Sequence, residues 1–118
     1  MIDTDDAERH FKRIEALAQN HRLAEVRRGT EDGIPALLVE NRAFVQLSDD
    51  NTLVVHCPQD QKLLLMDISP AIYFQTDEHE GQSTMLVRLD AISDEELGLR
   101  IEDAWHFRAP EHLKGKKS

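Results

Sequence analysis

Apolar residues recur at steps of three and four along the first twenty positions of the chain. One stripe of an amphipathic helix accounts for this spacing, and it is formed by Ala7, Phe11, Ile14, Leu17 and Ala18. We predict the helix from Thr4, whose hydroxyl can cap it, to Gln19. The acidic residues of its first turn favour the positive end of the helix dipole.

Between positions 23 and 56 the pattern changes to short apolar and β-branched runs separated by turn residues. These runs predict strands over 23–28, 36–40, 42–47 and 52–56. Turns are expected at Asp32-Gly33, at Glu40-Asn41 and at 49–51. Because the connections are short, consecutive strands must pair as an antiparallel meander.

The second half of the chain predicts two more strands between two helices. Pro58 fits the first position of a helix over 59–66, and strands over 72–75 and 84–89 flank a polar loop at 77–83. Ser93 and Glu96 form a capping box that opens the last helix, whose buried stripe includes Trp105. We expect Pro110 to close that helix.

The predicted order of elements is α-β-β-β-β-α-β-β-α, which defines the fold class. It favours an α+β two-layer sandwich, in which the N- and C-terminal helices cover one face of an antiparallel sheet. The 118 residues suit one domain over 1–113, followed by a basic flexible tail over 114–118. A hydrophobic fraction of 40% is sufficient for a packed core.

Cysteine content and the absence of targeting signals lead us to expect a cytoplasmic protein. Cys57 is the only cysteine, so no intrachain disulfide can form. The first residues are acidic and polar, unlike a secretory signal. The longest apolar run, at 63–66, is too short to span a bilayer, so we expect no membrane partner.

A series of short motifs in a fixed order resembles the MmcQ/YjbR family. The motifs are Gly33-Ile34-Pro35-Ala36, Phe44, Asp50-Asn51-Thr52-Leu53-Val54-Val55, Cys57-Pro58, Tyr73-Phe74-Gln75-Thr76, His79-Glu80-Gly81, Val87-Arg88-Leu89-Asp90, Glu102-Asp103-Ala104-Trp105 and Ala109-Pro110. With the first helix they cover nearly the whole chain. The chain departs from the family pattern at Asn41, where glycine is usual, and at Ser83-Thr84-Met85, where many relatives carry tryptophan.

This resemblance implies a frataxin-like (CyaY-like) α/β sandwich, in agreement with the predicted order of elements. It also implies a DNA-binding role, which the family carries by analogy of fold rather than of site. Frataxins bind iron through acidic residues of the first helix. Here Asp3, Asp5, Asp6 and Glu8 are acidic, but basic residues interrupt the series.

No catalytic motif is present, and we expect neither an enzyme nor a cofactor. The six histidines form no metal-binding spacing, and one cysteine cannot build a zinc site. Cys57 precedes a helix start, which can lower a thiol pKa, but a lone cysteine beside apolar strand residues is more typically a small core residue. His56 and Cys57 are neighbours on a strand and point to opposite faces.

The remaining hypotheses concern binding, with DNA or another protein as the partner. A DNA interface would use the positive residues Arg27, Arg28, Arg88, Lys114, Lys116 and Lys117. The formal net charge of −9 opposes phosphate binding unless these residues are segregated into one patch. Alternatively, the uncovered sheet face binds a protein, which requires an exposed apolar patch there. A third hypothesis, iron binding or thiol chemistry, requires converging carboxylates or an exposed Cys57 of low pKa.

Overall fold

A computed structural model describes residues 4–31, 33–49 and 51–114 of the chain. Its elements, in order, are α1 (Thr4–Asn20), β1 (Val26–Glu31), β2 (Ile34–Val39), β3 (Arg42–Asp49), β4 (Thr52–His56), α2 (Gln59–Ile68), β5 (Tyr73–Phe74), the 3₁₀ turn η1 (Asp77–His79), β6 (Thr84–Arg88), α3 (Asp94–Arg108) and α4 (Glu111–Lys114). The predicted alternation of helices and strands is confirmed. Only η1 and α4 are additional.

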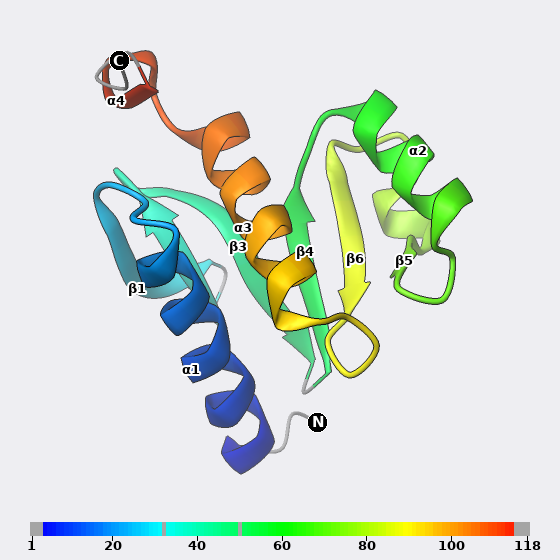
Figure 1. Cartoon of the computed structure of the whole chain (residues 1–118), viewed down its shortest axis with the longest axis horizontal. Helices are drawn as coiled ribbons and strands as arrows, with labels where there is room; N and C mark the ends of the chain where they lie inside the picture. Colours follow the sequence, from blue (N-terminus) through cyan, green and yellow to red (C-terminus); the bar gives the residue numbers. More distant parts are fainter. Residues whose placement is uncertain (1–3, 32, 50, 115–118) are drawn as a thin grey trace.

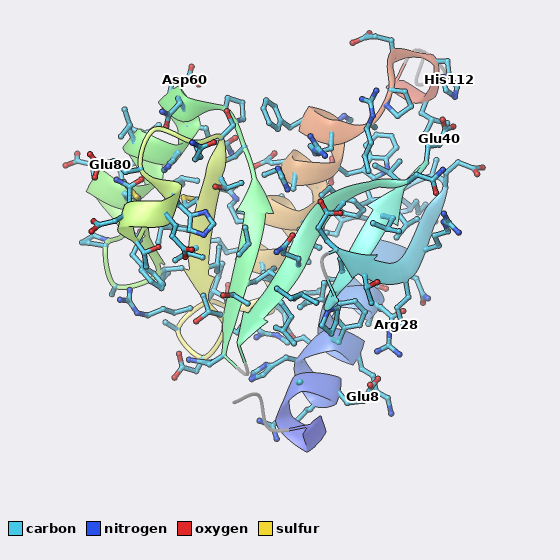
Figure 2. All side chains as sticks on the ribbon, turned by 180° about the vertical axis from the view of Figure 1, so that it is seen from behind. Glu8, Arg28, Glu40, Asp60, Glu80 and His112 are labelled. Atoms are coloured by element: carbon cyan, nitrogen blue, oxygen red, sulfur yellow. The ribbon has the colours of Figure 1, made fainter. Side chains whose placement is uncertain are left out.

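The six strands form one antiparallel sheet in the order β1-β2-β3-β4-β6-β5. Figure 1 shows α1 and α3 lying side by side across one face of this sheet, while α2 lies at the β5 end. The opposite face has no helix across β3 and β4 in Figure 2. The predicted α+β two-layer sandwich is therefore confirmed.

The core lies between the two end helices and the central strands. Phe11 and Ile14 of α1 and Ile101 of α3 are buried against the inward side chains of the sheet. On β4, Leu53 and Val55 belong to this core, so the intervening Val54 points to the other face. Alternation along the strands therefore decides which residues the two helices cover.

Backbone geometry explains why β1 begins three residues later than predicted. Arg22 and Glu25 both have positive φ, at 55° and 59°, so the chain is still turning where the sequence pattern predicted a strand. Leu23 is partly buried against the core from this turn. The tight turn expected at Glu40-Asn41 is confirmed, since both residues have positive φ (46° and 70°), as a two-residue type I′ hairpin requires.

The C-terminal segment differs from the prediction in two details. Helix α3 ends at Arg108, and Pro110 precedes the short helix α4 instead of closing α3. Ser93 caps α3 as predicted, because its Oγ accepts a hydrogen bond from the Glu96 amide at 3.2 Å. The Glu96 carboxylate does not complete the capping box, however, since it accepts a hydrogen bond from the Tyr73 hydroxyl.

Replacing Ser93 with alanine should lower the free energy of unfolding by about 1 kcal/mol, because the Glu96 amide loses its acceptor. Urea unfolding measures the change. Ser83→Ala, at an exposed serine in a loop, is the matched control and should have little effect. Equal stability of the two variants would show that the cap does not contribute.

Candidate functional site

The guanidinium of Arg28, a predicted phosphate contact, is held by side chains of α1. It lies 2.5 Å from Oε1 of Glu8 and 3.6 Å from Oε1 of Glu15. It also stacks over the Phe11 ring, 4.5 Å from the ring centre. The hydrogen bond raises the pKa of Arg28 and lowers the pKa of the Glu8 carboxyl. A phosphate would have to compete with two carboxylates for this side chain.

The other predicted phosphate contacts lie elsewhere. Arg27 follows the opposite face of β1 and donates a hydrogen bond to Oδ1 of Asn41. Arg88 on β6 stacks over Phe74 at 4.0 Å and donates to the carbonyl oxygens of Pro70 and Ala71 at 3.3 and 3.4 Å.

The structure does not bring these basic residues together. Four strand-to-strand steps separate β1 from β6, or roughly 19 Å at the usual spacing. Lys114 is the last residue of α4, and Lys116 and Lys117 lie outside the described residues. Arg27, Arg28 and Arg88 therefore form no single phosphate-binding patch.

Cys57 does not meet the requirement for thiol chemistry. The side chain is buried, at 2% exposure, and burial raises the pKa of the thiol to about 11. A thiol with this pKa stays protonated at neutral pH and is a poor nucleophile. The thiol-dependent hypothesis is therefore wrong, and Cys57 is a core residue.

The imidazole of His56, next to Cys57, is half-buried, and its pKa is lowered to about 4, mainly by desolvation and secondarily by the charge of Arg108. The unfolded chain protonates His56 near pH 6.5, whereas the folded chain keeps it neutral until about pH 4. Between these values the unfolded state binds more protons, so stability falls as the pH falls.

We expect His56→Gln to remove part of this acid sensitivity. The wild-type chain should lose up to roughly 3 kcal/mol more than the variant between pH 7 and pH 4. Urea unfolding at several pH values measures the difference, with His112→Gln at an exposed position as the control. Parallel pH profiles for wild type and His56→Gln would contradict the assignment.

Lys62 is a buried cation that the sequence pattern did not single out. Its side chain is 0% exposed, and Nζ donates hydrogen bonds to the carbonyl oxygens of His79 (2.6 Å) and Gln82 (2.9 Å). Burial lowers the pKa of this amine. Lys62 therefore fastens the loop that contains η1 to α2, and its role is structural.

Lys62→Met should keep the buried stem but leave two carbonyl groups without a donor. We expect a loss of about 2 kcal/mol of stability and faster amide exchange over 77–83. Lys12→Met, at an exposed lysine of α1, is the control. Unchanged exchange in the loop would rule out this role.

Metal binding finds no support in the described side chains. No three His, Cys, Asp or Glu residues among them are grouped so as to hold an ion. The resemblance to frataxins suggested Asp3, Asp5 and Asp6 as iron ligands. Their side chains lie outside the described part.

The exposed large apolar side chains lie on helices rather than on the open sheet face. Within the described residues they are Leu63, Leu64 and Ile68 of α2, and Leu99 and Phe107 of α3. On the open sheet face, Val54 and Leu86 are buried, at 4% exposure each. The patch that a sheet-face interface requires is therefore not among the exposed apolar residues.

A hydrogen bond joins α2 to α3 on the faces that carry several of these exposed residues. Gln61 of α2 donates a hydrogen bond to Asp103 of α3 at 2.8 Å. Leu64 is three residues from Gln61, so it shares that face of α2. Leu99 and Phe107 are each four residues from Asp103 and share that face of α3. We call Leu64, Ile68, Leu99 and Phe107 the α2–α3 surface; Leu63, two residues from Gln61, faces another side of α2.

A hollow of about 420 Å³ lies at one end of the α2–α3 surface. It is open to solvent and is lined by Pro58, Gln61, Asp103, His106 and Phe107. Its walls combine an aromatic ring and a proline with polar groups, which suits an apolar side chain of a partner bordered by hydrogen bonds.

One sequence signal could have indicated the α2–α3 surface. Leu63, Leu64 and Leu65 are consecutive, and three neighbouring helix positions cannot all face the core. Only Leu65 of these packs partly against the core. The run was used only to exclude a membrane span, so its exposed part was missed.

No family model, curated protein or solved structure matches the chain. Within the described part, no helix has both the length and the apolar character needed to cross a membrane.

Proposed function

We propose that the chain is a non-catalytic protein-binding module of the MmcQ/YjbR type, and that it binds its partner through the α2–α3 surface. The observation that carries the proposal is the exposure of Leu64 and Ile68 on the ten-residue helix α2, which are 58% and 64% accessible, beside Leu99 and Phe107 of α3. Isolated exposed leucines are ordinary, but a group of them on adjoining helix faces is typical of an interaction site.

Helix α2 is a suitable docking element because polar side chains hold it to the rest of the chain. Lys62 binds two loop carbonyls, and Gln61 binds Asp103 of α3. The exposed leucines are therefore presented on a fixed helix, which reduces the conformational entropy lost on binding.

Charge favours a protein over DNA as the partner. The formal net charge is −9, and the arginines predicted to contact phosphate are dispersed and engaged within the chain. Duplex DNA would therefore meet a repulsive overall field, and Arg27, Arg28 and Arg88 form no joint patch to offset it. The DNA-binding role implied by the resemblance becomes an alternative that the experiment must exclude.

The test is site-specific photo-crosslinking in the source cells. A photoreactive amino acid at position 64 or 99 should yield a discrete adduct with one protein. The same amino acid at Ser48, which is exposed on β3, is the position control and should not yield this adduct. Identical products from all three positions, or none from 64 and 99, would contradict the proposal.

Leu64→Glu should weaken binding of the crosslinked partner at least about thirtyfold, because a central apolar contact is replaced by a charge. The fold should be nearly unaffected, since the side chain is exposed. Gln59→Glu adds the same charge to the exposed start of α2 and is the matched control. Calorimetry with the purified partner measures both affinities.

DNA binding is examined with the same preparations. A gel-shift titration of the wild-type protein against a 30-base-pair duplex at low salt should show no complex. A complex that is weakened by Arg27→Ala with Arg28→Ala, and not by Leu64→Glu, would replace the protein-binding proposal with the DNA-binding one.

A further inference from the structure

Strand β1 ends the sheet on the side of α1. It pairs with β2 over Val26–Glu31, and no other described strand lies beyond it. Figure 2 shows β1 at the margin of the sheet, with Arg28 and Glu8 close to that margin. An edge strand of this length offers a row of backbone donors and acceptors for pairing with another strand.

The register shows which backbone groups face outward. Thr30 lies opposite Pro35, which has no amide hydrogen, so this position is a non-hydrogen-bonded pair of the β1–β2 ladder. Non-hydrogen-bonded pairs alternate with hydrogen-bonded ones along the ladder. Arg28 and Val26 therefore also form non-hydrogen-bonded pairs with β2. The amide and carbonyl groups of Val26, Arg28 and Thr30 therefore point away from β2, toward the free edge.

The hairpin between β2 and β3 supports this assignment independently. Val39 and Arg42 flank the two-residue Glu40-Asn41 turn, so they form a hydrogen-bonded pair with each other. Val39 therefore directs its backbone groups toward β3 and not toward Val26. No backbone hydrogen bond to another described element occupies the outward groups of β1.

Helix α1 leaves room beside this edge. An open groove of about 380 Å³ lies between α1 and β1, lined by Ala7, Glu8, Phe11, Arg28, Gly29, Thr30 and Pro35. Arg28 and Thr30, whose backbone groups point outward, both line it.

We propose that the free edge of β1 pairs with β1 of a second copy of this chain, antiparallel about a two-fold axis at Gly29. In this register Arg28 and Thr30 of one copy form hydrogen-bonded pairs with Thr30 and Arg28 of the other. The product is one continuous sheet through both copies, with both helical layers on the same side.

Charge complementarity selects a second copy as the occupant. The two-fold register places Arg27 of each copy opposite Glu31 of the other, twice in the dimer. These are non-hydrogen-bonded pairs, in which facing side chains come closest, and opposite charges at such positions are stabilising. Gly29 meets Gly29 at the axis, where neither copy presents a side chain.

The neighbouring two-fold register, centred on Arg28, is unfavourable because it places two arginines directly opposite each other. Charged residues on an edge strand usually prevent pairing between sheets. Here the charges oppose the shifted register and favour the one centred on Gly29. Arg28 itself is already paired with Glu8 and Glu15 of its own chain.

The dimer should be reversible and concentration-dependent. Its interface is one strand wide, which is small for a stable assembly, and the net charge of −9 on each copy opposes association. At about 0.15 M salt the long-range repulsion is largely screened. Sedimentation equilibrium in that buffer should give a monomer–dimer isotherm.

Charge reversal tests both the edge and the register. Arg27→Glu alone creates two Glu–Glu pairs in the homodimer, and Glu31→Arg alone creates two Arg–Arg pairs. Each variant should dimerise at least about tenfold more weakly than the wild type. An equimolar mixture restores both opposite-charge pairs and should form a heterodimer. Thermal melts establish that each variant is folded.

The matched control is a mixture of Arg27→Glu with Glu95→Arg, which adds the same charge at an exposed position of α3. The heterodimer in this mixture has one Arg27–Glu31 pair and one Glu–Glu pair, so it should form more weakly than the heterodimer of Arg27→Glu with Glu31→Arg. A wild-type chain that stays monomeric up to millimolar concentration would overturn the proposal. Dimerisation unchanged in both single variants would also overturn it, and would assign self-association to another surface, such as the α2–α3 surface.

Discussion

Burial of the sheet face beneath α1 and α3 is the constraint on which the rest of this structure depends. Strands β4 and β6 direct Leu53, Val55, Met85 and Val87 into the same core, and α3 lies over β3 and β4 on that face (Figure 1). Because successive residues point to opposite faces, shifting a strand by one residue would expose this entire set. The strong apolar pattern therefore specifies which face is closed and in what register.

The parts of the chain outside this core are free to serve other purposes. Helix α2 lies at the β5 end, and its inward position is occupied by Lys62, whose ammonium binds two loop carbonyls. With a lysine on the inner side, Leu63 and Leu64 face solvent. Strand β1, at the other end of the sheet, has an unpaired edge. Both proposed binding surfaces thus lie at the margins of the sandwich, whereas the buried Cys57 and the half-buried His56 have pKa values that keep them neutral at physiological pH.

The elements with a strong periodicity of apolar residues could be predicted from the sequence alone. The strand Thr52–His56 was predicted with its observed bounds, and the stripe of α1 and the Ser93 cap of α3 were also confirmed. The predicted start of β1 was wrong because Arg22 and Glu25 adopt positive φ although neither is glycine. Their sequence carries no strong turn signal. Helix α4 was missed because Pro110 was interpreted as a stop, although proline equally suits a helix start.

The candidate site was less accessible to prediction because it depends on long-range contacts. The arginines Arg27 and Arg28 look like a basic pair in the sequence, but α1 neutralises Arg28 through Glu8, twenty residues away. Likewise, only the fold brings Gln61 beside Asp103 and so joins the apolar faces of α2 and α3. Such pairings follow from the packing of the two layers, and no local pattern contains them.

Residue-resolved amide exchange along β1 gives the most direct test of this arrangement. At low protein concentration the account predicts slow exchange at Arg27, Gly29 and Glu31, which bond to β2, and fast exchange at Val26, Arg28 and Thr30. Raising the concentration should slow Arg28 and Thr30 selectively. Uniform protection along β1 in the dilute protein would contradict both the open edge and the register derived from Pro35.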